Sequence, residues 1–476
     1  MLQDILYTFN FNNLNYVLAI TGLLITIFSM MAVHSHIKVK HNMYYLLNIL
    51  YSISFLIVIF SKDWLVFFVA WELVTIITSL MLLWKSKGLA AQYFIIQFIG
   101  SSLLLFVILL AINNGYTEIM PIKETWLQNL FILGVGMKSA IFGFHFWLPS
   151  IYLQAPVTFN AISSGWVAKL GFITMLKLIP QGNQLLLVLA LLMIFYGGVK
   201  ALKVSNLKLL LTYSSISQLG YIALGIASGT LYGYIGSVLH IVAHGLAKTG
   251  LFLACGNFIK EYSSQCIYDF KNAWYRQKLS SLSMVISFAS LMGIPLLAGF
   301  NSKYLIKYGY QNEFLFTIIM YTASLLTAFY SLRFIYLAII KDLINNRSNS
   351  REQKYNLRIA EYLALVIMST LLIIVGFNAE LIELIISIVE KTKFEYNFIK
   401  GILEVVIYIL VSLIILKQLN WYKNIKEKSP TLDPIFASIN KWLYNVGRFL
   451  YRIINLDFQF QLLWIPIFLL ILFLLV

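Results

Sequence analysis

Charged residues are scarce in this sequence of 476 residues. They make up 11% of it, whereas 60% of the residues are hydrophobic and the mean hydropathy is +0.82. A soluble domain contains about 25% charged residues, so this composition excludes a soluble globular protein. It predicts a polytopic membrane protein.

Cysteine is scarce as well. Cys255 and Cys266 are the two cysteines of the sequence, too few for an iron–sulfur cluster held by four thiolates. The sequence has neither a CxxC pair nor a haem-attachment motif. We therefore expect no redox centre and no cofactor in this chain.

The net charge of +16 does not indicate a nucleic-acid partner, because the basic residues stand in short segments between apolar runs. No lysine or arginine precedes Lys38, so the charged region that begins a secretory signal peptide is missing. The first apolar run is therefore expected to remain in the protein as a transmembrane helix.

Long apolar runs, in contrast, are abundant. A run of about twenty apolar residues predicts a helix that spans a bilayer. The sequence predicts an all-α protein with about fourteen such helices, near residues 15–33, 43–60, 63–84, 91–112, 127–144, 158–179, 183–199, 209–228, 231–256, 280–298, 314–339, 359–377, 400–416 and 457–476.

The predicted organisation has three parts. Residues 1–42 hold the first helix and a loop, residues 43–377 form a membrane domain, and residues 378–476 form a C-terminal extension with the last two spanning helices. In the extension, the segment 433–456 has apolar residues at helical spacing with basic residues between them. We expect it to be an amphipathic helix on the cytoplasmic membrane surface, or a helix packed on a loop of another subunit.

Loop charges predict the orientation. With the N-terminus outside, the inner loops carry lysine and arginine while the outer loops carry mainly aspartate and glutamate, and this alternation is unbroken. The positive-inside rule therefore supports the helix count and places a multi-pass chain in the bacterial cytoplasmic (inner) membrane with its N-terminus outside.

Several ionisable residues fall inside the apolar runs, where a charge costs about 2.5–3.5 kcal/mol unless it is paired or lines a hydrated path. The candidate site residues among them are Glu72, Lys138, Lys169, His240, His244 and Lys248, and Lys303 joins them because it directly follows the interrupted run GIPLLAGF. Structural alternatives are static ion pairs, hydrogen-bonded core histidines, and a membrane-interface position for Lys248 or Lys303. No metal site is expected at the two histidines, because neither cysteine nor carboxylate accompanies them.

Two of the lysines lie beside interruptions of their helices. Lys138 precedes Gly143 and Pro149, and the stretch GIPLLAGF precedes Lys303. Broken helices at membrane depth survive only inside protein or beside water, and pairs of them mark ion sites in transporters built from inverted repeats. The two breaks lie an odd number of helices apart, which reverses the direction of the helix. We therefore predict two inverted five-helix repeats, each with a broken helix.

These residues suggest a proton relay. Burial destabilises a charged lysine and a nearby carboxylate stabilises it, so movement of Glu72 relative to Lys138 would switch the lysine between holding and releasing a proton. Histidines titrate near neutral pH and can pass protons on. The hypothesis is a chain through the middle of the membrane, bridged by waters, in the order Glu72, Lys138, Lys169, the His240, His244 and Lys248 stripe, and Lys303.

The sequence around these residues resembles a known family. FFVAWE contains Glu72, KSAIFGFHFWLP begins at Lys138, Lys169 follows an AP pair, HIVAHGLAKTGLFLACG spans 240–256, and GIPLLAGFNSK ends at Lys303. With NLKLLLTYSSISQLGYIALGI, these stretches resemble the antiporter-like proton-channel subunits shared by respiratory complex I and Mrp-type cation/proton antiporters.

The resemblance implies a fold of fourteen helices with two inverted five-helix repeats and implies a role for each residue. Glu72 would be the acid paired with the broken-helix lysine Lys138, Lys169 and Lys248 would be connecting lysines, and Lys303 would be the terminal lysine.

The chain also departs from the family. Glu72 falls on the third predicted helix, whereas the family usually has this acid on the fifth, so we expect about two N-terminal helices of the family to be missing. Ser163 and Ser164 stand where a histidine often precedes the second channel lysine. The link between Lys169 and Lys248 is therefore expected to be the weakest of the relay.

Three functions remain open. The first is a proton-translocating subunit of a multi-subunit Mrp-type antiporter that exchanges protons for Na⁺ or K⁺; the spacing from Ala155 to Lys169 and the terminal lysine favour the Mrp D type. The second is a proton-pumping membrane subunit of a complex I-like NADH:quinone oxidoreductase, a translocase. The third is a structural or assembly paralogue. Other membrane subunits are expected partners, and any cation site is expected outside this chain.

Overall fold

The computed structural model describes residues 11–37, 41–311, 313–341, 358–377 and 398–419, together with Ser438, Lys441, Trp442 and Asn445. The predicted helix at 457–476 and most of the predicted amphipathic segment 433–456 lie outside these residues.

Long apolar helices dominate the described residues, which contain no β-strand. Nine helices in this part of the chain are long and apolar enough to span a membrane. They are α2 (Phe11–Met31), α4 (His41–Phe60), α5 (Trp64–Leu82), α6 (Lys87–Asn113), α11 (Gln184–Lys203), α12 (Leu207–Ala227), α13 (Leu231–Tyr262), α17 (Phe314–Ile335) with the π-helical turn η2 (Tyr336–Ile340), and α19 (Ile359–Phe377). The all-helical polytopic fold is thereby confirmed.

Shorter helices make up three further predicted spans. They are α7 (Thr125–Ser139) and α8 (Trp147–Gln154), then α9 (Val157–Gly165), the 3₁₀ turn η1 (Val167–Lys169) and α10 (Leu170–Leu178), and then α15 (Lys278–Met292) and α16 (Ala298–Tyr308). Two single turns, α3 (Val33–His36) and α14 (Ala273–Arg276), lie at helix ends, and α21 (Phe398–Leu419) is the last long helix described.

The two predicted helix breaks share one backbone geometry. α7 ends at Ala140 and α15 ends at Gly293, and both residues are left-handed, with φ of 51° and 83°. In the first break the Ile141 N–H donates to the Gly136 carbonyl, and in the second the Ile294 N–H donates to the Ala289 carbonyl, each at 3.0 Å. Both breaks thus close their helix with the same hydrogen-bonded motif, as expected of repeats.

The cause of the first break differs from the prediction. Pro149 lies inside the first turn of α8, where a proline is tolerated because the N–H it lacks has no partner in a helix. The chain already leaves the helix at Ala140, directly after Lys138 and Ser139. Lys138 therefore lies in the last turn of α7 rather than half-way along a helix at 127–144.

The continuous helix predicted at 158–179 is also interrupted. α9 ends at Gly165, and η1 carries Lys169 before α10 begins. Gly165 packs so closely on α13 that a Cβ there would lie 2.4 Å from the Thr249 hydroxyl oxygen. The Lys169 ammonium donates to the Ser164 carbonyl. It thereby supplies a partner to a carbonyl in the last turn of α9, where the intrahelical bonds run out.

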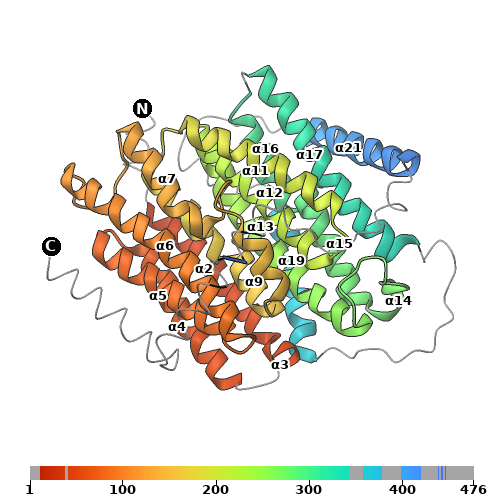
Figure 1. Ribbon diagram of the computed structural model, residues 1–476. Helices are drawn as coiled ribbons and strands as arrows, with labels where there is room; N and C mark the ends of the chain where they lie inside the picture. Colours follow the sequence, from red (N-terminus) through yellow and green to blue (C-terminus); the bar gives the residue numbers. More distant parts are fainter. Residues whose placement is uncertain are drawn as a thin grey trace.

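The helix α13 is the centre of the bundle. It packs against α2, α9, α12, α15, α16 and α19, while α4 to α7 lie to one side of it and α15 to α17 to the other (Figure 1). We call the face that holds loops 61–63, 114–124, 179–183, 228–230 and 309–311 together with Glu313 the upper face. The lower face holds segments 32–36, 83–86, 204–206 and 263–277 (Figure 1).

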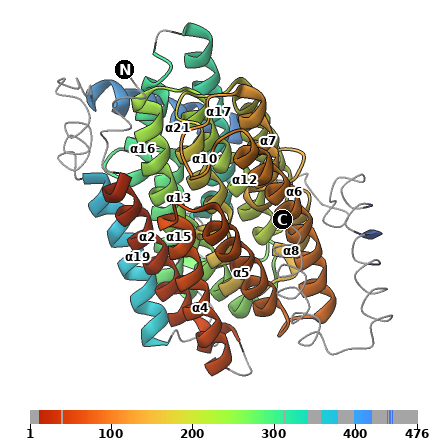
Figure 2. The same cartoon turned by 90° about the vertical axis from the view of Figure 1, so that its left-hand side faces the viewer.

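The first and last long helices of the bundle lie together. α19 packs beside α2 and runs along its length (Figure 2). At the lower end of α2, His36 and the buried Glu361 of α19 meet at 2.8 Å from Nε2 to Oε1. This contact ties the chain that follows the second repeat to the helix that precedes the first.

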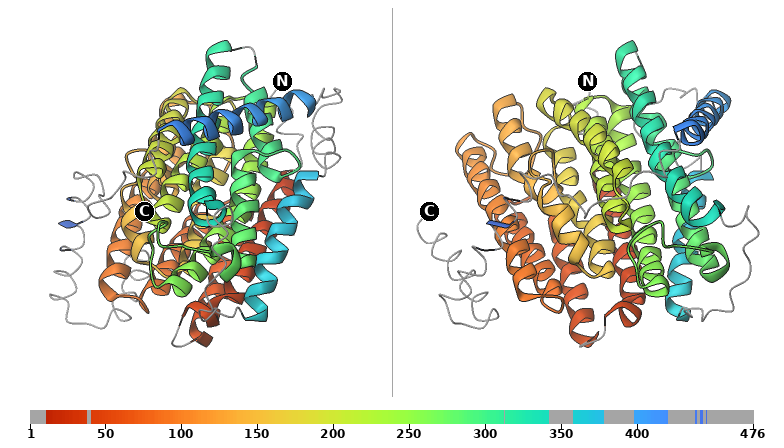
Figure 3. Two further views of the ribbon diagram at one scale, coloured as in Figure 1. Left: turned by 90° about the vertical axis from the view of Figure 1, so that its right-hand side faces the viewer. Right: turned by 45° about the vertical axis from the view of Figure 1, so that its right-hand side comes forward.

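The helix α21 lies differently from the rest. It packs on α17 and crosses the bundle axis near the upper face rather than running parallel to the other helices (Figure 3). This placement differs from the spanning orientation predicted for residues 400–416. An ion pair between Glu404 of α21 and Lys307 of α16, with Nζ 2.8 Å from Oε1, holds α21 to the bundle.

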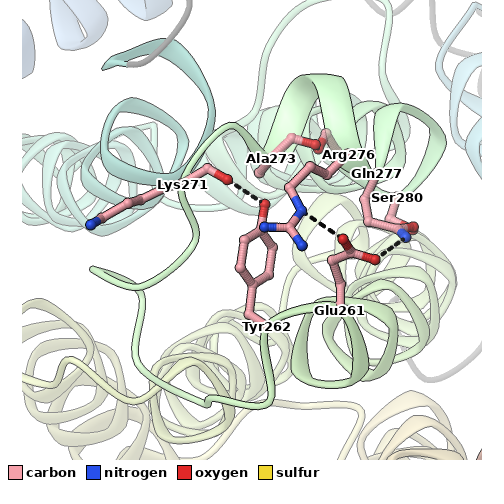
Figure 4. Close-up of polar contacts among 8 residues, drawn as sticks. Glu261, Tyr262, Lys271, Ala273, Arg276, Gln277 and Ser280 are labelled. Atoms are coloured by element: carbon pink, nitrogen blue, oxygen red, sulfur yellow. Dashed lines mark hydrogen bonds and ion pairs between the residues drawn. The ribbon is translucent and has the colours of Figure 1, made fainter. Parts of the chain in front are cut away.

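The lower-face loop 263–277 is held by side chains at the end of α13. The nearly buried Glu261 accepts hydrogen bonds from Arg276 Nε at 2.6 Å and Gln277 Nε2 at 3.2 Å (Figure 4). Tyr262 donates to the Lys271 carbonyl at 2.6 Å, and its ring lies 4.9 Å from the Arg276 guanidinium. The loop is therefore fixed to α13 at several points.

Candidate functional site

The predicted site residues lie on five elements, α5, α7, η1, α13 and α16, and all of them are buried. Their exposed fractions range from 0% for Lys169, His240, His244 and Lys248 to 7% for Lys303. None of the four lysines reaches an interface by extending its side chain, so the membrane-interface alternative does not hold for Lys248 or Lys303.

Lys138 contacts the helix that carries Glu72. Its Nζ donates to the Trp71 carbonyl at 3.0 Å and to the Thr75 hydroxyl at 2.7 Å, and it lies 4.3 Å above the Trp71 ring. Glu72 and Lys138 interact electrostatically. However, neither carboxylate oxygen of Glu72 has a hydrogen-bond partner. The two residues are thus neighbours without forming the static ion pair that was the structural alternative.

The Lys169 side chain lies against α13, the helix that carries Lys248. A Cβ on Gly245 would lie 3.9 Å from Lys169 Cε, which places the Lys169 side chain against α13 one residue after His244. Lys248, one turn further along α13, donates to the Leu211 carbonyl at 2.9 Å and to the Ser214 hydroxyl of α12. Lys138 and Lys248 therefore share one arrangement, since each ammonium binds a carbonyl and a hydroxyl of a neighbouring helix.

Two serines join the surroundings of these lysines. Ser164, whose carbonyl accepts from Lys169, forms a hydroxyl–hydroxyl hydrogen bond of 2.8 Å with Ser215 of α12. Ser215 in turn donates to the Leu211 carbonyl at 2.8 Å, the same carbonyl that accepts from Lys248. In the interval that was expected to be the weakest, Lys169 and Lys248 are thus linked through Ser164, whose carbonyl and hydroxyl bind different partners, and through the Leu211 carbonyl, which accepts from both Ser215 and Lys248.

The buried ionisable residues described so far form a row, and His240 and His244 continue this row toward α16. The His240 and His244 rings lie parallel within 7°, with centroids 6.0 Å apart. His240 contacts the Ser302 hydroxyl at 2.9 Å through Nδ1 and the Gln218 side-chain oxygen at 3.2 Å through Nε2. His244 has no hydrogen-bond partner on either nitrogen. The core-histidine alternative therefore fits His240 and does not fit His244.

Lys303 ends the row at the second break. Its Nζ donates to the Leu291 carbonyl at 2.7 Å and lies 4.2 Å from the centroid of the Tyr221 ring. Leu291 is in the last turn of α15, where a helix leaves carbonyls without intrahelical partners and is negatively polarised. The break thus supplies the polar environment that the ammonium needs.

The predicted residues are not all joined directly. One group lies on α13 or beside it and consists of Lys169, His240, His244, Lys248 and Lys303. No hydrogen bond connects Lys138 to Lys169. In the described part of the chain, no group of three or more His, Cys, Asp or Glu side chains could hold a metal ion. The site therefore consists of proton-binding groups, hydroxyls and carbonyls.

Sequence reasoning missed Ser164 and Ser215 as connecting residues. Ser164 was noted only as standing in place of a histidine. The signal that could have found the pair is the stretch YSSISQ at 213–218, because buried hydroxyls inside an apolar helix need partners. Arg333 was missed too; it is 2% exposed and donates to the Leu202 and Val204 carbonyls at the end of α11.

Comparisons with known proteins agree with this architecture. Residues 61–327 match the family described as NADH:quinone oxidoreductase/Mrp antiporter, TM. The chain is 25% identical over 373 residues to NADH-quinone oxidoreductase subunit M of Escherichia coli K12, covering 71% of this chain and 73% of that one. It is 30% identical over 224 residues to NADH-quinone oxidoreductase subunit N of Desulforudis audaxviator, but that match covers only 44% of this chain and 45% of the relative.

Two solved structures share the fold. A chain of the Mrp complex from Dietzia sp. DQ12-45-1b superposes with a TM-score of 0.75 at 21% identity, over 97% of this chain and 54% of that one. A chain of respiratory complex I from Thermus thermophilus superposes with a TM-score of 0.67 at 21% identity, over 78% and 85%. Since the family match covers more than half of the sequence, this chain belongs to the NADH:quinone oxidoreductase/Mrp antiporter transmembrane family.

Proposed function

We propose that this chain moves protons through the membrane along Glu72, Lys138, Lys169, the α13 stripe and Lys303, as a subunit of a Mrp-type monovalent cation/proton antiporter. The observation that carries the proposal is the row of buried lysines and histidines between two helix breaks of the same geometry. Buried lysines are costly to keep charged, which makes them groups that can release and regain a proton.

The polar partners of the lysines support this role. Each of the four ammonium groups donates to a backbone carbonyl at or near a helix break or beside a hydroxyl. Carbonyls and hydroxyls accept from the charged lysine but do not hold its proton as firmly as a carboxylate would. The lysines are thereby stabilised enough to be buried and remain able to exchange protons.

The charges of the two faces support the predicted orientation of the chain in the membrane. Described basic residues of the lower face include Lys85, Lys203, Lys271, Arg276 and Lys278, and they outnumber Glu261 and Asp269 there. In the upper-face loops Asp63, Glu118, Glu124 and Glu313 outnumber Lys62 and Lys123. By the positive-inside rule the lower face would be cytoplasmic and the upper face would be outside. Protons would then travel between these faces through the middle of the bundle.

The central test is replacement of Lys138. We expect Lys138→Ala, expressed with its neighbouring subunits in an antiporter-deficient and salt-sensitive bacterium, to abolish cation-driven proton movement in inverted membrane vesicles. Lys177→Met is the matched control, since Lys177 donates to the Ile59 carbonyl near the upper face and is not in the row. Normal proton movement in a fully assembled Lys138→Ala complex would contradict the proposal.

A second candidate is a proton-pumping membrane subunit of a complex I-like NADH:quinone oxidoreductase. It is favoured by the relatives, among which are subunits M and N of NADH-quinone oxidoreductases. Purifying the chain together with its partner subunits distinguishes the two candidate functions. Quinone-reducing activity that co-purifies, without rescue of salt tolerance, would favour the second candidate, and rescue of cation/proton exchange without such activity would favour the first.

A further inference from the structure

Three interacting side chains, those of Lys307, Tyr321 and Glu404, lie beyond Lys303 at the upper end of α16. We call them the charged triangle. Lys307 donates to both carboxylate oxygens of Glu404 at 2.8 Å and also to the Tyr321 hydroxyl at 2.8 Å. Tyr321 donates to Glu404 Oε1, again at 2.8 Å. The three residues come from α16, α17 and α21, so the crosswise helix α21 contributes the acid of the group.

A cavity connects this triangle to the terminal lysine of the row. It is lined by Lys303, Lys307, Tyr321, Ser324, Glu404 and Tyr408, among others, and has a volume of about 40 Å³. One water needs about 10–15 Å³, so the cavity has room for roughly three waters. The polar groups of the lining can form hydrogen bonds to such waters, while Met292, Phe300, Met320 and Val405 make up an apolar part of the wall.

The cavity leads from the interior toward the surface. Lys303 is only 7% exposed, whereas the side chains of Lys307 and Glu404 are 22% and 18% exposed. Lys303 and Lys307 are four residues apart on α16 and therefore lie on the same side of that helix. Lys307 is in the last turn of α16, next to the upper-face segment 309–311.

We propose that Glu404 is the outer proton acceptor of the path and that α21 covers and completes the outlet, an inference that rests on the proton movement proposed above. A proton leaves the Lys303 ammonium, crosses the waters of the cavity and binds the Glu404 carboxylate, which leaves Lys303 as a neutral amine. Glu404 then releases the proton at the upper face and returns to its ion pair with Lys307.

The hydrogen bonds of the charged triangle indicate a role for each of its three residues. Lys307 and Tyr321 hold the carboxylate at the cavity wall with three short hydrogen bonds. A protonated Glu404 no longer attracts Lys307 as an anion, so the pair loosens only while the proton is in transit. The resting ion pair thus closes the outlet.

The test uses Glu404→Gln in the assembled complex. Glutamine keeps an oxygen that accepts from Lys307 and Tyr321, so α21 should stay attached, but it cannot take up a proton. We expect proton movement in vesicles to fall at least about tenfold, as for removal of a general acid or base. Glu404→Asp should keep a substantial part of the activity, and the matched control Glu313→Gln, at an exposed upper-face acid outside the cavity, should leave the rate unchanged.

The results separate this inference from the proposed function. Loss of transport in Lys138→Ala together with a normal rate in Glu404→Gln overturns the outlet and leaves the proposed function standing. A normal rate in Lys138→Ala overturns the proposed function itself. If Glu404→Gln does not assemble, Val405→Phe tests the same path, because it fills the cavity from α21 without touching the ion pair; we expect a similar loss, and a normal rate would overturn the outlet.

Discussion

The hydroxyl pair between Ser164 and Ser215 can be tested by removing its members one at a time. Ser215 donates its proton to the Leu211 carbonyl, so Ser164 must be the donor of the 2.8 Å bond between the two hydroxyls. The consequences of the two replacements therefore differ. Ser164→Ala removes one donor and leaves Ser215 with its carbonyl partner, whereas Ser215→Ala leaves the Ser164 hydroxyl buried without its partner.

The expected stability losses follow from this asymmetry. A net hydrogen bond contributes about 0.5–1.5 kcal/mol, which is the expected cost of Ser164→Ala. A buried polar group left without a partner costs about 1–3 kcal/mol, so Ser215→Ala should be the more destabilised variant. The double variant should be less destabilised than the sum of the two single ones, because both remove the same bond.

Transport should respond to either replacement alone. The space left by one hydroxyl oxygen is too small for a water, which needs about 10–15 Å³, so no water restores the connection. If the hydroxyls carry or position the proton between Lys169 and Lys248, each single variant should slow proton movement at least about tenfold, or raise the barrier by about 1.4 kcal/mol.

Thermal unfolding of the purified complex gives the stability order, and vesicle measurements give the rates. Ser217→Ala is the matched control, because Ser217 is a buried serine of α12 that donates to the Ile194 carbonyl of α11, away from the row. It should lose similar stability and keep its transport rate. Wild-type transport in both Ser164→Ala and Ser215→Ala, with the complex intact, would refute the reasoning.

Two further predictions concern other parts of the bundle. His240→Ala should destabilise the complex more than His244→Ala, by about 1–3 kcal/mol, because only His240 has hydrogen-bond partners to lose. Equal melting temperatures of the two variants would contradict this difference in stability. Both variants should slow transport. Gly197→Ala should lower stability by about 1–3 kcal/mol, since a Cβ there would lie 2.5 Å from the Ser217 backbone nitrogen. Gly250→Ala is its control, because a Cβ there would meet only side-chain hydroxyls, those of Ser287 at 3.2 Å and Ser283 at 3.5 Å. Equal melting temperatures for these two variants would argue against such close packing of α11 on α12.

Much of the helical framework follows from the sequence, because length and apolarity alone decide which segments span a bilayer. The breaks near Lys138 and Lys303 were predicted from glycine and proline. The break at Trp166 was not, because it depends on how closely Gly165 packs against Thr249, a contact between segments more than eighty residues apart. The left-handed Ala140 was likewise hidden, since alanine gives no local signal for that conformation.

The candidate site was predictable only in part. A charged residue inside an apolar run stands out in any sequence, so Glu72, Lys138, Lys169 and Lys248 could be named at once. Ser215 could not, because a serine is common in membrane helices. Glu404 lies in the predicted span 400–416 but was not singled out, and its significance depends on the crosswise course of α21. That course depends on a tertiary ion pair with Lys307, which no local pattern encodes.

The length and burial of α13 constrain how the protein can move. Its residues extend from Leu231 to Tyr262, about 48 Å at 1.5 Å per residue, and every position from 233 to 258 is buried. A rod enclosed on all sides cannot tilt or slide without displacing most of its neighbours, since protein interiors are close-packed and resist compression. Carriers with inverted repeats usually work by rocking one repeat against the other, and here such a motion would have to displace α13. Any working cycle should therefore proceed by rotamer changes and rearranged waters on a stationary frame, and a cross-link that immobilises α13 against α12 should leave turnover intact.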